Sequence, residues 1–307
     1  MLPLKNTFYS INFILLLINS TFISKCTAPL NNKDLPYKLS SPAKEYILQH
    51  KLTEVSGLSF ISDNEVALIQ DEDGTIFYFN LEKGTISRKI TFAKDGDYED
   101  LKILGDTAYI IRSDGTIFEV LNLKGKSSDM IKNKYKTGLA QTNDTEGMCY
   151  DYQRKLLLIA CKGSPGIGDK KYKNKKAVYS FDPATKKLSA EPVTLIDANE
   201  VENKAYGTGK NIIERFMRFY RDTKQSAFLP SGISIHPFTH EMYVISSVSN
   251  LMVVMDTTGK VKNAVKLSPR EFKQPEGIAF DSAGNLYISN EGRNGKGNIL
   301  KFLYLKN

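Results

Sequence analysis

The chain has little histidine, only three residues among 307. His236 and His240 flank a predicted strand turn, and His50 ends a short strand-like segment far from both in sequence. A Ser-His-Asp relay or a His-ligated zinc needs histidine beside the other members of the site. Gly232-Ile233-Ser234 also lacks the Gly-x-Ser-x-Gly pattern of a nucleophile elbow. We therefore expect neither type of hydrolytic site.

Cysteine is equally scarce, with three residues. Cys149 and Cys161 fall on two predicted strands that pair with each other, about three residues out of register. That offset corresponds to roughly 10 Å along a strand, beyond the limit of about 7 Å between the Cα atoms of a disulfide. The sequence predicts two free thiols, Cys149 in the core and Cys161 near the rim.

Long apolar runs are also missing. The apolar stretch at residues 11–23 has thirteen residues, too few to span a bilayer. Lys5 precedes it, which is typical of an export signal. The following Cys26 resembles the cysteine that is lipidated in bacterial lipoprotein signals, although Lys25 replaces the usual small residue before it. We expect a protein lipid-anchored to a membrane of the bacterial cell envelope, with a periplasmic or secreted protein as the alternative.

No concentrated basic stripe is present, although the net charge is +8 and the pI is near 9.1. The lysines are spread over the whole chain, which indicates a solvated surface. Nucleic-acid binding would require clustered charge with aromatic residues between, so we expect no nucleic-acid partner. Apolar residues at 41% are sufficient for a packed core.

Five times along the chain, a short acidic or polar segment is followed by a small residue and then by an aliphatic one. The copies are Glu54-Val55-Ser56-Gly57-Leu58, Tyr98-Glu99-Asp100-Leu101, Thr145-Glu146-Gly147-Met148, Pro230-Ser231-Gly232-Ile233 and Pro275-Glu276-Gly277-Ile278. Most of the spacings are about 45 residues, and a period of about 40–50 residues is typical of one four-stranded propeller blade. The sequence therefore predicts an all-β protein, a single five-bladed β-propeller over residues 41–307. Residues 1–26 would be the signal segment, and residues 27–40 a tether.

The last copy ends one strand short, and residues 44–50 (KEYILQH) are the natural donor of that strand. Their pairing with the last blade would close the ring and leave no sheet edge open. Six blades would require residues 196–229 to form a blade. Instead Ile212, Phe216 and Tyr220 recur at helical spacing, which predicts an inserted amphipathic helix near 210–222. A glycine- and lysine-rich insertion is expected at residues 163–176.

Because strands alternate in direction within a blade, the starts of the innermost strands should surround the mouth of the central channel. Carboxylates gathered there repel one another unless protons or a cation intervene, and Ca²⁺ is the hard ion that such oxygen ligands suit. The candidate metal ligands are Glu54, Asp71, Glu146, Glu276, Asn290 and Glu291, and the candidate ligand-binding residues are Arg112, Lys162 and Arg293. Arg112 near Glu99, and Lys162 near Glu146, also suit simple ion pairs. A solvated acidic rim without any ion is the alternative.

Three segments together resemble the SdiA-regulated family of exported or membrane-anchored bacterial β-propellers. They are Asp71-Glu72-Asp73-Gly74, Pro275-Glu276-Gly277-Ile278-Ala279 and Ile288-Ser289-Asn290-Glu291. The resemblance covers about residues 40–305. It implies a propeller fold and suits a calcium ion near the channel mouth, but it implies no particular activity. More distantly, the last blade is similar to gluconolactonase-type and NHL-repeat propellers, and the former use a channel-mouth metal on a lactone or ester carbonyl.

These observations favour a monomeric, non-catalytic binding propeller that holds Ca²⁺ at its mouth and recognises an unidentified small or extended ligand. The rival function is a metal-dependent hydrolase of a lactone, ester or phosphoester, with Glu146 or Glu99 as general base. A metal-free platform for protein interactions is the third.

Overall fold

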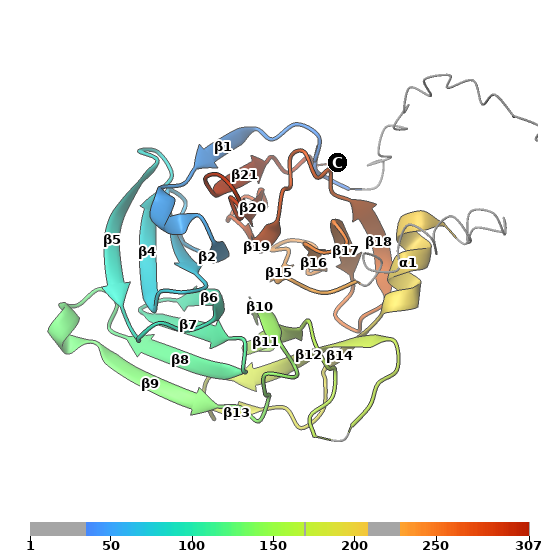
Figure 1. Cartoon of the computed structure of the whole chain (residues 1–307), viewed down its shortest axis with the longest axis horizontal. Helices are drawn as coiled ribbons and strands as arrows, with labels where there is room; N and C mark the ends of the chain where they lie inside the picture. The colour runs from blue at the N-terminus through green and yellow to red at the C-terminus, as the bar shows by residue number, and fades with distance from the viewer. Residues whose placement is uncertain (1–34, 169, 208–227, 307) are drawn as a thin grey trace, which may run out of the picture. The chain divides into compact units, whose positions relative to one another are not determined.

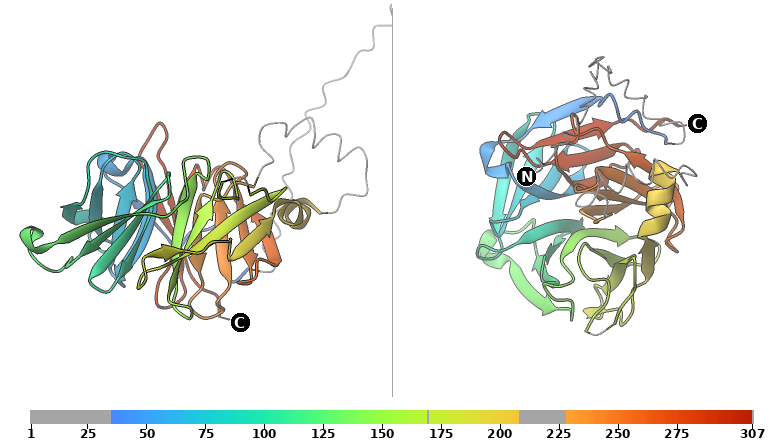
Figure 2. Two further views of the ribbon diagram at one scale, coloured as in Figure 1. Left: turned by 90° about the horizontal axis from the view of Figure 1, so that it is seen from below. Right: turned by 45° about the vertical axis from the view of Figure 1, so that its right-hand side comes forward.

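The computed structural model describes residues 35–168, 170–207 and 228–306. These residues form five antiparallel sheets around a central axis, as in a β-propeller (Figure 1). Seen from the side, the sheets stand next to one another around the ring (Figure 2). The prediction of an all-β, five-bladed propeller is confirmed, and the described residues do not form a sixth blade.

Three blades are simple four-stranded meanders, in which each strand pairs with the next along the chain. The first contains β2 (Val55–Ser62), β3 (Glu65–Gln70), β4 (Thr75–Asn80) and β5 (Thr85–Thr91). The second contains β6 (Tyr98–Leu104), β7 (Thr107–Arg112), β8 (Thr116–Leu121) and β9 (Ile131–Lys136). The fourth contains β15 (Gly232–Ile235), β16 (Met242–Ser246), β17 (Leu251–Met255) and β18 (Val261–Lys266).

The third and fifth blades depart from this pattern. The third has β10 (Thr145–Asp151), β11 (Leu156–Cys161) and β12 (Lys175–Asp182), and its outer edge is divided between β13 (Lys187–Leu188) and β14 (Thr194–Asp197). The predicted insertion at 163–176 follows β11, and its last two residues belong to β12. The fifth has β19 (Pro275–Phe280), β20 (Leu286–Asn290), β21 (Asn298–Phe302) and, from the other end of the chain, β1 (Lys44–Ile47).

Local sequence explains where the strands turn. Between β4 and β5, the Asn80 side chain accepts hydrogen bonds from the backbone N–H groups of Glu82 and Lys83. Gly84 follows with φ of 65°, a conformation that glycine adopts without strain. The β-branched and aromatic residues of β4 suit a strand that is buried on both faces, whereas β5 is the mostly exposed outer strand. Turn chemistry and strand composition therefore agree in this blade.

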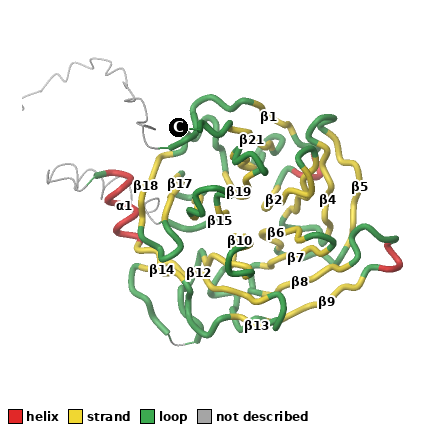
Figure 3. The backbone as a smooth tube through the Cα atoms, turned by 180° about the vertical axis from the view of Figure 1, so that it is seen from behind, coloured by secondary structure: helices red, strands yellow, loops and turns green. Residues whose placement is uncertain are grey.

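The ring is closed by β1, which pairs antiparallel with β21 (Figure 3). Tyr46 lies opposite Ile299, and the Leu48 N–H donates to the Gly297 carbonyl at 2.9 Å. The predicted closing strand is therefore confirmed. It covers the outer edge that β21 would otherwise expose to other chains.

The chain just before β1 also packs on the ring. Tyr37 and Leu39 are buried, 1% and 4% exposed, among side chains of the fourth and fifth blades. The Tyr37 hydroxyl donates to the Gly284 carbonyl at 2.7 Å, and the Leu305 N–H donates to the Pro36 carbonyl at 2.9 Å. The ring is therefore fastened by this segment as well as by the closing strand.

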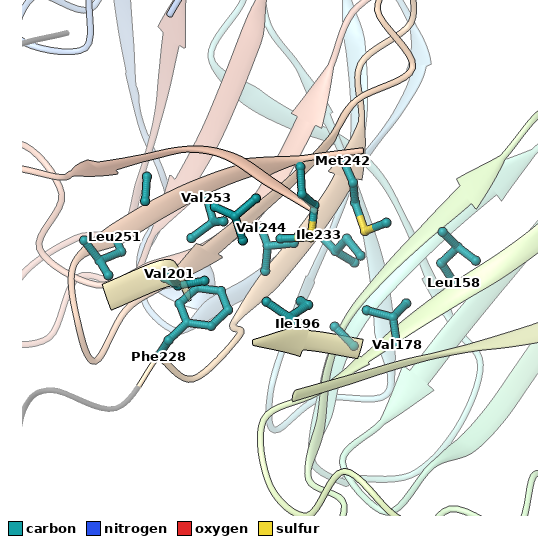
Figure 4. Close-up of a cluster of buried hydrophobic side chains, with 14 of the residues drawn as sticks. Leu158, Val178, Ile196, Val201, Phe228, Ile233, Met242, Val244, Leu251 and Val253 are labelled. Carbon is teal, nitrogen blue, oxygen red and sulfur yellow. The ribbon is translucent and has the colours of Figure 1, made fainter. Parts of the chain in front are cut away.

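The hydrophobic core is divided into clusters between neighbouring blades. Figure 4 shows the cluster between the third and fourth blades, where Leu158 and Val178 face Ile233 and Val244. The single described α-helix, α1 (Ala198–Tyr206), covers its outer side with the buried Val201. The predicted helix near 210–222 lies outside the described residues.

The start of α1 is fixed by Asp197, whose carboxylate accepts hydrogen bonds from the backbone N–H groups of Asn199 and Glu200. Its length is nine residues. Among the described residues, no helix is long and apolar enough to span a membrane.

Candidate functional site

The inner strands of four blades carry a β-bulge near their first residues. The strand register shifts between Val55 and Gly57, between Tyr98 and Asp100, between Thr145 and Gly147, and between Pro275 and Ile278. A bulge leaves a residue unpaired and re-aims its side chain, and bulges are common beside functional sites. The bulged residues include Ser56, Glu99, Glu146 and Glu276, so three blades direct a glutamate toward the mouth of the ring.

The bulges also define which residues of the repeat are equivalent. In the first blade the equivalent of Glu146 is Ser56, because Ser56-Gly57-Leu58 matches Glu146-Gly147-Met148. Glu54 lies two residues earlier, at the position of Asp144 in the third blade. The fourth blade has Ser231, as expected, and the Ser231 hydroxyl donates to the Pro275 carbonyl at 2.8 Å. The ring of equivalent positions thus holds three glutamates and two serines.

A cavity of about 270 Å³ opens at this end of the ring. Its lining consists of seven carboxylates, one lysine and two neutral polar residues: Ser56, Asp71, Asp97, Glu99, Asp144, Glu146, Lys162, Gln274, Glu276 and Glu291. Five of the predicted site residues therefore lie together in the lining, as does the alternative catalytic residue Glu99. The walls are almost entirely polar and strongly negative.

Crowding and burial raise the pKa values of the carboxyl groups. Burial, followed by the charges of Glu146 and Glu291, raises the pKa of Glu276 to about 8. Burial and the nearby Asp71 and Glu54 raise the pKa of Glu291 to about 7. The pKa of Asp71 rises to about 6, mainly through burial and the charge of Glu54. An empty mouth therefore holds protons at neutral pH that ordinary carboxylates would have released.

Glu99 and Glu146 also have raised pKa values. Burial raises the pKa of Glu99 far above its usual range, and the charge of Glu146 raises it further. Glu146 is 7% exposed, and its Oε1 lies 2.7 Å from Lys162 Nζ. Burial raises the pKa of Glu146 although this lysine opposes the effect. Burial lowers the pKa of Lys162, but Glu146 raises it above its usual value.

The floor below the cavity is built by close contact between neighbouring inner strands. A Cβ atom at Gly57 would lie 2.4 Å from Asp100 Oδ1, and one at Gly232 would lie 2.2 Å from the Glu276 carbonyl oxygen. Where four blades have glycine, the second blade has Asp100, which is 3% exposed. Its carboxylate accepts hydrogen bonds from the N–H groups of Met148 in the next blade and of Leu101.

The remaining predicted residues lie near the cavity or apart from it. Asn290 pairs with Pro275 in the fifth blade and donates through its side chain to Asn298, outside the lining. Arg293 donates to the Gln274 side chain at 3.0 Å. Arg112 forms a two-point ion pair with Asp114, not with Glu99.

Glu54 is outside the lining too, although its charge acts on Asp71 and Glu291. Cys26 lies outside the described residues. Cys149 and Cys161 are both free and buried, and their register partners are Leu158 and Thr145.

Sequence reasoning missed the residues two positions before each bulge. Asp97 precedes Glu99, Asp144 precedes Glu146, and Gln274 precedes Glu276 in the same manner. A pattern repeated in these blades, a carboxylate or amide followed by any residue and then glutamate, is the signal that could have identified them. An alignment of the first copy on Glu54 instead of Ser56 obscures this pattern.

The chemistry of the mouth suits a hard divalent cation, which prefers oxygen ligands. Asp71 Oδ1 and Asn290 Oδ1 are buried without a hydrogen-bond partner. Over residues 35–168, 170–207 and 228–306, however, no three His, Cys, Asp or Glu side chains are arranged to hold a metal ion as they stand. The ligand types therefore fit calcium, but the carboxylates would have to draw closer together to coordinate it.

The family model for SdiA-regulated proteins matches residues 37–294. The chain therefore belongs to the SdiA-regulated family, and the match extends from the segment before β1 to the loop before β21. No curated protein sequence matches the chain.

Solved structures share the fold at low sequence identity. Glutaminyl cyclase from Myxococcus xanthus is 13% identical, with a TM-score of 0.55 over 86% of this chain and 95% of that one. A gluconolactonase from Xanthomonas campestris is 9% identical, with a TM-score of 0.49 over 81% of this chain and 72% of that one. The TM-score to glutaminyl cyclase indicates a shared fold, and an identity of 13% says nothing about a shared activity.

Proposed function

We propose that this propeller is anchored in the bacterial envelope through Cys26 and binds a divalent cation, Ca²⁺ by preference, at its mouth. A small or extended ligand would be recognised at the same opening, without catalysis. The observation that carries the proposal is the 270 Å³ cavity, which sets seven carboxylates against the single cation Lys162.

The raised pKa values give the energetic reason for a cation. Glu276 and Glu291 are held partly protonated at neutral pH by burial and by their neighbours. A divalent ion would displace those protons and offset the repulsion between the ionised groups. Binding would therefore release protons and tighten as the pH rises. Lys162 in the lining would supply positive charge for polar groups of the ligand, with Arg293 near the opening and Arg112, held by Asp114, further away.

We expect the purified protein to contain calcium and to be stabilised by it. At a calcium concentration one hundred times its Kd, the stabilisation is about 2.7 kcal/mol, which corresponds to a rise in Tm of roughly 5–10 °C for a domain of this size. Metal analysis and thermal unfolding with calcium or with a chelator are the measurements. Glu276→Gln should abolish the rise, because it removes a central carboxylate.

Glu82→Gln is the matched control, because Glu82 is exposed in the β4–β5 turn at the other end of the ring. It should retain the full response to calcium. A protein without bound metal, whose Tm no divalent ion changes, would contradict the proposal and leave the metal-free interaction platform.

One observation favours a hydrolase as the second candidate. Glu99 and Glu146 line the same cavity, the first half-buried and the second buried, and both have raised pKa values, as expected of groups that exchange protons with a substrate. Glu99 would donate or accept the proton, while Lys162 keeps Glu146 charged and oriented. A bound cation would supply polarisation of a lactone, ester or phosphoester oxygen.

The hydrolase predicts turnover of at least one compound in a panel of lactones, esters and phosphoesters. Glu99→Gln should lower kcat by about 10²–10⁴-fold, with KM nearly unchanged. Glu82→Gln should have no effect. If the protein responds to calcium but turns over no compound in the panel, the hydrolase is contradicted and only the binding function is left.

A further inference from the structure

We infer that the face of the ring opposite the acidic mouth docks on an anionic lipid bilayer, so that the mouth points away from the membrane. We call this surface the basal face and define it by Lys38, Phe238, Leu303, Leu305 and Lys306. The inference rests on the proposed anchoring through Cys26, and it adds an orientation to it.

The strand register places these residues at the end away from the mouth. In the fifth blade Asn290 pairs with Asn298 at the mouth end of β21, whereas Leu286 pairs with Phe302 at its other end. Leu303, Leu305 and Lys306 continue from Phe302. Phe238 lies in the turn that joins β15 to β16, which also faces away from the mouth.

Three large apolar side chains of the basal face are open to solvent. Phe238 is 49% exposed, and Leu303 and Leu305 are each 52% exposed. The ammonium group of Lys306 lies 6.0 Å from the centre of the Phe238 ring. Lys38, which follows the buried Tyr37 in the sequence, is exposed. Apolar side chains beside lysines are the composition of surfaces that lie in the headgroup region of a bilayer.

The chain enters the ring on this same face. The Pro36 carbonyl accepts from the Leu305 N–H, and the Tyr37 hydroxyl donates to Gly284 in the β19–β20 turn. Only eight residues lie between Cys26 and Leu35, where the described chain begins. The nine steps of chain from Cys26 to Leu35 extend at most about 30 Å. A lipid on Cys26 would therefore hold the basal face close to the membrane surface.

Charge favours the same orientation. The mouth presents seven carboxylates and one lysine. On the basal side two carboxylates are paired with lysines: Glu241 with Lys262 at 2.8 Å, and Asp281 with Lys301 at 3.9 Å. Asp63 accepts from the neutral Ser282 hydroxyl and keeps its charge. His240 is exposed in the same turn as Phe238. Each lysine near an anionic membrane contributes about 1 kcal/mol of attraction, whereas the mouth would be repelled.

The absence of tryptophan makes the test direct, because a single introduced indole reports on its own surroundings. The full-length protein would be reconstituted into vesicles of phosphatidylcholine and phosphatidylglycerol with brominated acyl chains, which quench nearby indoles. Leu303→Trp is the test variant. Ile47→Trp is the matched control, since Ile47 is also 52% exposed and lies in the same blade at the mouth end, opposite Asn298.

We expect Leu303→Trp to be quenched at least twofold more than Ile47→Trp. Lys38→Glu combined with Lys306→Glu should lower that quenching, while Lys173→Glu in the 163–176 insertion should leave it unchanged. Equal quenching at both positions in vesicle-bound protein would contradict docking of the basal face, but not anchoring through Cys26. Protein that does not sediment with vesicles would overturn both, and unquenched protein that forms dimers would assign the face to a second copy instead.

Discussion

Glu276→Gln should stabilise the protein at pH 8 and change little at pH 4.5. The pKa of Glu276 in the folded protein is about 8, against a usual value of 4.5. Between these values the folded protein holds a proton that the unfolded chain has released, so stability is lost as the pH rises through this window. The loss approaches about 5 kcal/mol well above pH 8, at about 1.36 kcal/mol per pKa unit. Glutamine has no carboxyl proton to release, so the Glu276→Gln variant does not lose this stability.

The measurement is urea unfolding at pH 4.5, 6 and 8 in the presence of a chelator. Glu291 should add to the slope of the wild-type protein in the same direction, because its pKa is raised to about 7. Glu82→Gln serves as the control and should follow the wild-type curve. A variant at Glu276 that is less stable than wild type at pH 8 would show that the mouth does not strain this carboxylate.

Tyr37→Ala should lower the free energy of unfolding by about 3–5 kcal/mol, as expected for the truncation of a fully buried aromatic residue. Tyr37 is 1% exposed, and its ring packs at 5.8–6.4 Å from the rings of His236, Tyr243, Phe280 and Tyr304. Removing it would loosen the segment that leads into the closing strand β1.

Tyr37→Phe separates packing from hydrogen bonding. It removes only the bond to the Gly284 carbonyl and should cost about 1 kcal/mol. Both variants can be compared by chemical unfolding followed by circular dichroism. If Tyr37→Ala lowered the free energy of unfolding by less than the roughly 1 kcal/mol expected for Tyr37→Phe, the segment before β1 would not contribute to closure of the ring.

Much of the fold could be predicted because each blade repeats its local signals. The turn at Asn80 and Gly84, the apolar run before it and the alternating residues after it are enough to place β4 and β5. The orphan segment 44–50 predicts ring closure, since a sheet edge needs a partner. The divided outer edge of the third blade has no such signal, because β14 is assigned by its pairing with β12 and not by its own composition.

The candidate site was predicted less completely, for a reason that lies in the bulges. The sequence indicates which carboxylates reach the mouth, and Asp71, Glu146, Glu276 and Glu291 are found there. It does not indicate the two-residue offset between Glu54 and Ser56, because a bulge inserts a residue without changing the apolar pattern that follows. Arg112 was expected near Glu99 by strand counting, but Asp114 is closer within its own turn and binds it at two points.

The contact of Asp100 with the neighbouring blade has a consequence for how the ring can relax. The Asp100 carboxylate ties the second blade to the Met148 N–H of the third, and the charge of Lys102, two residues further along the same strand, opposes the rise in the pKa of Asp100 that burial causes. Separation of these two blades would leave a buried carboxylate without that partner. Rearrangement of the mouth around an ion would therefore come from its side chains, with the inner strands staying in place.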